Sequence, residues 1–301
     1  MTFGVVLFLL LVFAPSAGAG PITFSTALPI PKGQAIVRGQ ALVAKASQES
    51  AGSARDLTAV VSPWVFVYGA REDLALFLVL PALVHKSLDA EGPGGKQERS
   101  ATGFGDVSVF ARYTVFQRDL PGETLRVAPF AGLEAPTGKD NAKDESGRLP
   151  RPLQPGSGSW DAFFGSVFTW QKLDWELDLD AGHRLNTRDE GFEFGDVAFA
   201  DASFQYRLWP REVRSGLPGF LYAVLETNLE WQDKNRIGGK SDPDSGGWRW
   251  FVDPGIQYVG KRFVLEAVAQ LPALEELGGQ ALETDFQLRV GFRWNFWVPF
   301  S

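Results

Sequence analysis

The sequence contains no cysteine, which excludes disulfide scaffolds, thiolate metal sites and cysteine nucleophiles. A single methionine and two histidines leave few side chains for metal binding or acid–base chemistry. Basic residues are also in deficit, because 29 lysines and arginines stand against 36 acidic residues, for a net charge of -7. This balance argues against nucleic-acid binding. We therefore expect no catalytic residues, no metal site, no cofactor and no nucleic-acid partner.

Long hydrophobic runs are missing as well. Beyond the first twenty residues, no apolar segment approaches the ~20 residues that a membrane-spanning helix needs. Residues 5–13 form a short apolar run, and small residues follow as far as Ala19. This pattern predicts a signal peptide over residues 1–19, cleaved after Ala19, and an exported, unlipidated chain. The proline-rich residues 20–32 are expected to form a periplasmic or plug segment.

What the sequence does have is 24 phenylalanines, 10 tryptophans, 33 glycines and long stretches of period-two alternation. Segments 173–180 and 286–296 alternate apolar and polar residues, and no segment shows a helical stripe. The pattern predicts twelve strands. They cover residues 33–44, 56–69, 73–86, 103–117, 124–136, 158–171, 173–186, 195–209, 219–232, 247–259, 261–272 and 283–296. Such strands exceed the ~5–6 residues typical of soluble sheets and suit a tilted bilayer crossing.

The connections between these strands alternate between short and long. The links at residues 70–72, 172 and 260 are short, whereas the fifth long link covers residues 137–157. Outer-membrane barrels show this alternation, with short periplasmic turns and long outer loops. We therefore predict an all-β fold, a single antiparallel transmembrane β-barrel of about twelve strands over residues 33–301. The expected location is the outer membrane of a Gram-negative-type cell, with membrane lipid, lipopolysaccharide and the barrel-insertion machinery as partners.

Several short motifs resemble a known family, the outer-membrane barrel transporters named for the MetA-pathway of phenol degradation. The matching motifs are Gly103-Phe104-Gly105-Asp106, Pro136-Thr137-Gly138-Lys139-Asp140, Pro155-Gly156-Ser157-Gly158-Ser159-Trp160-Asp161, Gly182-His183-Arg184-Leu185-Asn186 and Gly195-Asp196. The resemblance covers most of the expected mature chain. It implies a barrel that moves small solutes in connection with aromatic degradation, without identifying the solute. His183 replaces an aromatic residue of the family pattern, so we assign it no role.

Strand alternation also predicts which side chains line the lumen, because the apolar positions must face lipid. The predicted lumen-lining residues are Asp106, Arg112, Arg126, Glu134, Asp174, Glu176, Asp178, Asp180, Arg184, Asp201, Arg207, Glu226, Glu230, Arg249, Asp253, Arg262, Glu266, Asp285, Arg289 and Arg293. The acidic ladder of 174–180 is expected to face Arg289 and Arg293 across the lumen. This arrangement would give a narrow pore with a mild preference for cations.

Three functional hypotheses follow from this interior. The first is an outer-membrane channel for small solutes, including aromatic or hydrophobic compounds, because strands 56–69 and 73–86 are apolar on both faces and give one oily lumen wall. The second is a plugged structural or adhesive barrel, in which residues 21–31 fold inside and cover that wall. The third and least favoured is an outer-membrane lipid hydrolase, for which His183 lacks a following serine.

Overall fold

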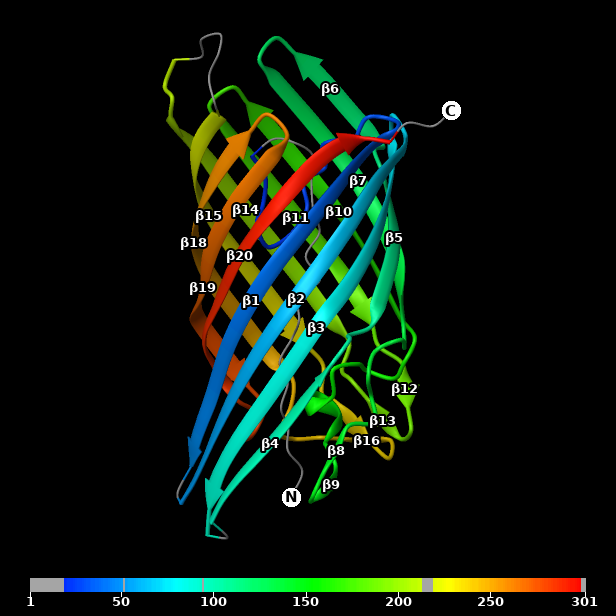
Figure 1. Cartoon of the computed structure of the whole chain (residues 1–301), viewed down its shortest axis with the longest axis vertical. Helices are drawn as coiled ribbons and strands as arrows, with labels where there is room; N and C mark the ends of the chain where they lie inside the picture. Colours follow the sequence, from blue (N-terminus) through cyan, green and yellow to red (C-terminus); the bar gives the residue numbers. More distant parts are fainter. Residues whose placement is uncertain (1–18, 51, 94, 213–218, 299–301) are drawn as a thin grey trace.

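The computed structural model describes residues 19–298 except 51, 94 and 213–218. The signal-peptide prediction therefore lies almost wholly outside the described residues. Within them, the only helix is the three-residue 3-10 turn η1 (Arg151–Leu153), and none is long and apolar enough to cross a membrane. The strands of the wall are all paired antiparallel (Figure 1).

A closed barrel of twelve strands forms the molecule, as the alternation predicted. One wall strand is interrupted and consists of β4, β5 and β6. The wall strands are β1 (Gln34–Ser50), β2 (Ser53–Arg71), β3 (Leu74–Gly92), β4 (Gly95–Gly103), β5 (Val107–Tyr113), β6 (Phe116–Leu120), β7 (Glu123–Ala135), β10 (Asp161–Lys172), β11 (Trp175–Leu185), β14 (Val197–Trp209), β15 (Gly219–Gln232), β18 (Gly247–Gly260), β19 (Phe263–Leu277) and β20 (Glu283–Trp297). The barrel closes where β20 pairs with β1, from Gln34 opposite Trp297 to Ser47 opposite Glu283.

The interrupted strand corrects the prediction of one continuous strand over residues 103–117. β4 pairs only with β3, β5 pairs with β3 and β7, and β6 pairs only with β7. The first break, at residues 104–106, occurs where the Asp106 carboxylate accepts hydrogen bonds from a distant loop. The strand therefore stops because this side chain anchors other backbone.

The two ends of the barrel differ, and we name them the short-turn end and the long-loop end. At the long-loop end, residues 45–50, 53–55, 87–92 and 95–102 are paired strand, whereas the sequence predicted loops. β1 and β2 continue to a turn that includes Gly52 (φ 83°), and β4 begins at Gly95 (φ 95°). The two hairpins are long and project beyond the other wall strands at this end (Figure 1).

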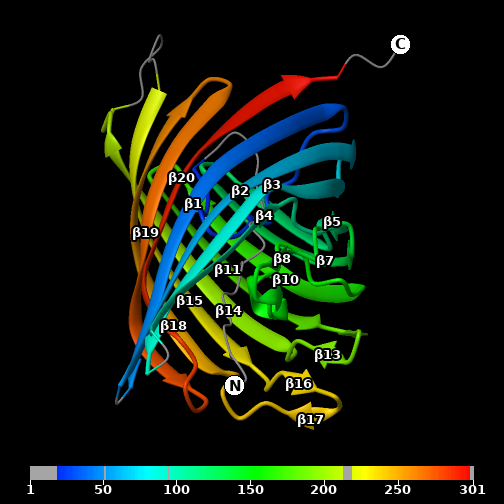
Figure 2. The same ribbon diagram turned by 60° about the horizontal axis from the view of Figure 1, so that its bottom comes forward.

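Four short strands form a small sheet among the long loops, in the order β12 (Arg188–Asp189), β13 (Phe192–Glu193), β16 (Arg236–Ile237) and β17 (Lys240–Ser241). A separate hairpin, β8 (Lys143–Asp144) and β9 (Gly147–Arg148), lies in the loop 137–157. Figure 2, which brings this end forward, shows these elements gathered on one side of the barrel opening.

The exterior of the barrel wall is apolar. Large hydrophobic side chains at alternate positions are exposed, including Leu78, Leu179, Leu265 and Leu288, while their sequence neighbours face inward. Tryptophans lie near both ends of this surface. Trp209, Trp294 and Trp297 are exposed at the short-turn end, and Trp160, Trp248 and Trp250 at the long-loop end. Two aromatic zones around an apolar band are typical of a bilayer-spanning barrel.

This surface predicts a large difference between neighbouring positions on β20. Replacing the outward Leu288 with arginine should destabilise the barrel by roughly 2–4 kcal/mol if the residue lies near the bilayer midplane. Replacing the adjacent inward Gln287 with leucine should cost much less. Urea unfolding in lipid vesicles measures both values, and equal costs would contradict the assignment of faces.

The orientation of the barrel is also testable. Lys143 lies exposed in the long-loop hairpin β8–β9, and Lys172 lies at the short-turn end of β10. An epitope inserted beside Lys143 should bind antibody on intact cells, because long loops of such barrels face outward. An epitope beside Lys172 should bind only after permeabilisation. The reverse labelling pattern would show that the barrel is inserted the other way.

Candidate functional site: the barrel lumen

The interior of the barrel contains most of the charged residues that the sequence placed there. Sixteen of them are buried: Asp106, Arg112, Arg126, Glu134, Glu176, Asp178, Asp180, Asp201, Arg207, Glu226, Glu230, Arg249, Asp253, Glu266, Arg289 and Arg293. Arg184 is partly buried beside Glu134 and Asp161. Because the exterior of the same strands is apolar, these groups face a polar lumen.

Three predicted lumen residues lie elsewhere, and these assignments are corrected. Asp174 is in the turn before β11, where its exposed side chain forms an ion pair with the buried Arg207. Arg262 is exposed in the short turn between β18 and β19. Asp285 is exposed near the long-loop end, where it accepts a hydrogen bond from Ser47 (2.8 Å). The apolar–polar alternation continues one or two residues beyond the part of each strand that encloses the lumen, and these three residues lie in those extensions.

The segment from Gly20 to Ile30, which we name the plug segment, lies inside the barrel. Its residues are buried except for Pro29, which is partly exposed, and the chain then leaves the lumen at Pro31 and Lys32 (Figure 1). Thr23 is its deepest contact along β15, and Ile30 lies again beside the short-turn end near Gly69. Both ends of the plug segment therefore lie toward the short-turn end, and its middle reaches further into the lumen.

Polar side chains of the wall hold the plug segment through its backbone. Glu226 accepts hydrogen bonds from the amides of Ile22 (2.6 Å) and Thr23 (2.9 Å) and from the Thr23 hydroxyl (2.6 Å). Arg112 donates to the Ser25 hydroxyl and to the carbonyls of Thr26 and Leu28. These contacts satisfy backbone groups that would otherwise be buried without partners.

A buried ion triad lies beside the start of the plug segment. Glu266 pairs with Arg293 (2.8 Å) and with Arg38, whose Nε lies 2.7 Å from the carboxylate, and all three side chains are fully buried. The two arginines also donate to the carbonyls of Ile22 and Pro21. The triad corrects the expectation that Arg293 faces the acidic ladder across the lumen, since its partner comes from the adjoining strand.

An apolar wall covers the other side of the plug segment. Ala27 and Ile30 pack in one cluster with side chains of β1, β2, β3, β5, β7 and β10. Four phenylalanines form its aromatic part, with the rings of Phe77 and Phe110 stacked at 4.1 Å and those of Phe130 and Phe163 edge-on to Phe110. The oily lumen wall and the inward plug, which the sequence left as alternatives, are therefore both present.

The loop 137–157, which we name the mouth loop, closes part of the long-loop end. Asp106 accepts hydrogen bonds from the amides of Gly138 (2.7 Å) and Ser157, so one carboxylate fixes both ends of the loop. The family-like motifs around residues 103–106, 136–140 and 155–161 meet at this point. Close contacts among Gly105, Gly138 and Gly156 leave no room for a Cβ at Gly138 or Gly156.

The middle of the mouth loop is only partly exposed, which corrects the expectation of a wholly exterior loop. Leu149 and Leu153 are buried with Leu57, Leu88 and Leu282 of the wall and the adjoining loop. The Lys86 ammonium donates to the carbonyls of Pro152 (2.9 Å) and Gln154 (2.8 Å). The loop folds inward because these apolar side chains are buried only against the barrel.

The outward side of the mouth loop carries ion pairs. Arg99 of β4 donates to both oxygens of Asp144 (2.7 and 3.0 Å), and these bonds hold the pKa of that carboxyl below its ordinary value. Arg151 pairs with Asp140, Asp189 and Glu190, which links the mouth loop to the β12–β13 hairpin. Contacts with β3, with β4 and with the β12–β13 hairpin therefore hold the mouth loop in place.

Beside and beyond the plug segment, one side of the wall is acidic. Six buried carboxylates there form no ion pair with lysine or arginine among the described residues: Glu176, Asp178, Asp180, Asp201, Glu226 and Asp253. They lie on the adjacent strands β11, β14, β15 and β18, and we name them the acidic face. Arg112 acts electrostatically on Asp178 and Asp180, and Arg289 on Glu226 and Asp253.

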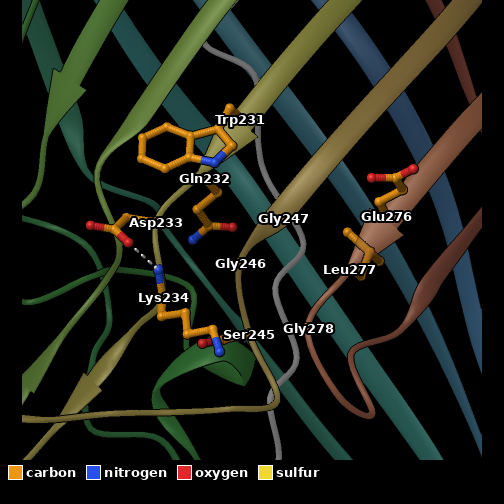
Figure 3. A pocket seen from close by; sticks show the side chains of 10 residues that line it. All are labelled: Trp231, Gln232, Asp233, Lys234, Ser245, Gly246, Gly247, Glu276, Leu277 and Gly278. Carbon is orange, nitrogen blue, oxygen red and sulfur yellow. Dashed lines mark hydrogen bonds between the residues drawn. The ribbon is translucent and has the colours of Figure 1, made fainter.

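A separate hollow lies at the rim of the long-loop end, where β15 and β19 end and β18 begins (Figure 3). Its volume is about 470 Å³, and Trp231, Lys234 and Glu276 are among the residues that line it. Close backbone contacts at Gly246, Gly247 and Gly278 shape its floor. The hollow is open and carries charges of both signs, so it defines no specific site.

The histidines show no catalytic arrangement. His183 stacks on Phe164 at 6.1 Å on the outer face of the wall, and His85 contacts the Thr102 hydroxyl at 2.7 Å. In the described part of the chain, no group of three histidine or acidic side chains is placed to hold a metal ion.

Several lumen residues escaped the sequence analysis. Arg38, Gln40, Arg55 and Lys86 are buried polar residues of β1, β2 and β3. Arg38 and Gln40 occupy inward positions of β1 among apolar neighbours, and this alternation could have revealed them. Arg55 lies just outside the predicted strand 56–69, and Lys86 is the last residue of the predicted strand 73–86.

The closed wall, apolar outside and charged inside, defines a transmembrane β-barrel of the outer-membrane type. The profile of the family described as "Putative MetA-pathway of phenol degradation" matches residues 46–271. The chain belongs to this family, which confirms the resemblance seen in its motifs. No curated protein matches the chain.

The chain is similar to several solved structures. The COG4313 outer membrane channel from Pseudomonas putida F1 superposes with a TM-score of 0.65 at 17% identity, covering 93% of this chain and 100% of that one. The β domain of the Bordetella autotransporter BrkA gives a TM-score of 0.44 at 15% identity, covering 88% and 100%. The translocator domain of NalP from Neisseria meningitidis gives 0.44 at 11% identity, covering 89% and 90%.

Proposed function

We propose that the protein is an outer-membrane channel that passes small solutes through a narrow, charged lumen. The observation that carries this proposal is the acidic face, whose six carboxylates are buried without ion-pair partners in the described chain. In a purely structural barrel, opposite charges would be expected to pair and fill the interior. An interior with unpaired charge is instead suited to a water-filled passage.

The proposed solutes include aromatic or hydrophobic compounds. The phenylalanine cluster on β3, β5, β7 and β10, which adjoin the acidic face, supports this class, because stacked and edge-on rings favour aromatic partners. The plug segment covers this cluster through Ala27 and Ile30, so we propose that the plug segment must shift for such a solute to pass. The family description is consistent with this class.

A plugged structural barrel is the second candidate. The observation that favours it is the number of hydrogen bonds that Glu226, Arg112 and Thr169 make to the plug segment. Planar-bilayer conductance of the refolded protein, followed by liposome swelling with phenolic and sugar solutes, separates the two functions. A channel gives discrete low-conductance steps and swelling. A structural barrel gives neither, and the same null result in a variant lacking the plug segment would exclude the channel.

The acidic face makes a further prediction about ion selectivity. Its six carboxylates face two arginines, so the double change Asp178→Asn and Asp180→Asn should halve its excess negative charge. Neighbouring carboxylates on one strand face lie about 6.5–7 Å apart, within a Debye length, so their potentials add. We expect low conductance with mild cation preference, reduced by roughly half in the double variant.

The measurement is the reversal potential in a KCl gradient. Asp89→Asn is the matched control, because Asp89 is an exposed carboxylate on the hairpin beyond the lumen. An unchanged reversal potential in the double variant would mean that the acidic face does not line the conducting path.

A further inference from the structure

Two carboxylates of the acidic face lie directly opposite each other. Asp180 of β11 pairs in register with Asp201 of β14, and both side chains point into the lumen. Like charges at directly opposed positions of an antiparallel pair destabilise the sheet. In the described chain neither residue forms an ion pair with lysine or arginine, so the wall itself does not relieve this repulsion.

Asp180 also lacks hydrogen bonds. It is only 3% exposed, and neither of its carboxylate oxygens has a partner among the described residues. Asp201 accepts one bond, from the Asn228 amide (2.8 Å). Burying a carboxylate without donors is costly, so this arrangement calls for a donor that the described chain does not provide.

A neutral acceptor on the neighbouring strand also lacks a hydrogen-bond donor. Gln205 of β14 is fully buried, and its Oε1 has no donor, while its Nε2 donates to Ser203. Single oxygens of Glu176 and Asp178 on β11 also lack partners. This side of the lumen is therefore rich in buried acceptors and poor in donors. Arg112, the cation that acts electrostatically on Asp180, directs its donors to the plug segment.

We propose that the Asp180–Asp201 pair binds a primary ammonium group of a solute in the lumen. A primary ammonium carries one positive charge and three N–H donors, which complement two opposed carboxylates. The described chain places no group of three histidine or acidic side chains to hold a metal ion, so an organic cation is the better fit. Asn228 joins the site to the plug segment, because its amide also lies 3.2 Å from the Thr23 hydroxyl.

The proposal rests on the proposed function only in requiring that a solute reach the lumen. Together they describe solutes that combine an ammonium group with an apolar part, since the acidic face and the phenylalanine cluster lie on adjoining parts of one lumen wall. The site would then give the channel a preference among solutes, beyond a general attraction of cations.

Isothermal titration calorimetry of the full-length protein, refolded in detergent at low salt, tests the site. The probes are n-butylammonium chloride and its isomer tetramethylammonium chloride, which has the same charge but no N–H donor. We expect saturable binding of n-butylammonium only. Asp180→Asn should weaken it about tenfold, as expected for the loss of one charged hydrogen-bond partner. Asp89→Asn, on the exterior hairpin, should leave it unchanged.

A second variant, Gln205→Leu, removes the unpartnered Gln205 oxygen beside the pair and should also weaken binding, so the test does not depend on the folding of Asp180→Asn alone. Circular dichroism checks that each variant is folded. Equal binding of the two isomers, no binding of either, or binding unaffected by Asp180→Asn in a folded variant would overturn the site. Conductance in KCl, recorded on the same preparation, tests the proposed function separately. Binding without conductance would support the ammonium site and refute the channel. Conductance without binding would support the channel and refute the ammonium site.

Discussion

Deleting residues 21–30 should raise the single-channel conductance about tenfold, because a twelve-stranded barrel lies between side-chain-filled and water-filled sizes and the plug segment occupies its lumen. The ten residues carry the contacts to Glu226, Arg112 and Thr169 described above. Without them the lumen at the short-turn end loses its main obstruction. Planar-bilayer recordings of wild-type and deleted protein measure the change.

A disulfide provides the control, because the chain has no cysteine of its own. The Ala27 amide lies 2.7 Å from the Thr169 hydroxyl, so cysteines at these two positions should cross-link the plug segment to β10. The oxidised protein should conduct no better than the wild type, and reduction should restore wild-type behaviour. If the conductance stays as small after the deletion as in the wild type, the mouth loop rather than the plug segment limits the current.

Replacing Glu266 with alanine should destabilise the barrel by about 3–5 kcal/mol, the usual cost of removing one partner from a buried ion pair. Arg38 and Arg293 would then face each other inside the wall without a counter-charge. Unfolding by urea in lipid vesicles measures the loss. Glu283→Ala on β20 is the control, since Glu283 is exposed and should change stability by less than about 0.5 kcal/mol.

A triple variant separates charge from packing at this site. If Glu266, Arg38 and Arg293 are all replaced by apolar residues of similar size, most of the lost stability should return, because no charge remains buried. A large loss in the triple variant as well would mean that the hydrogen bonds from the two arginines to Pro21 and Ile22 matter more than the ion pairs.

The barrel itself could be predicted because its two requirements are local in sequence. Each strand must alternate to face lipid and lumen, and each must be long enough to cross the bilayer. The segment predicted at 173–186 is therefore close to the observed β11 (Trp175–Leu185), and the last strand was predicted at 283–296 and observed at Glu283–Trp297.

The parts that the sequence did not reveal depend on distant contacts. The mouth loop folds inward because Leu149 and Leu153 meet side chains of β2 and β3 far away in sequence. Arg38 and Glu266 are separated by 228 positions and meet through the closure of the barrel. Alternation predicts whether a side chain faces lipid or lumen, but not which residues lie beside it. The triad and the plug contacts could therefore be identified only once the register of the strands was known.

Asp106 has a consequence for how the mouth loop can change. One carboxylate holds the amides of Gly138 and Ser157, so the chain between them starts and ends at a fixed point regardless of its content. For a flexible loop, each doubling of length adds only ~0.6 kcal/mol of closure cost. Residues 140–155, which lie inside this fixed point, can therefore change in length and sequence at little cost in loop closure. New sequences inserted there can alter what the barrel displays or admits while its wall stays the same.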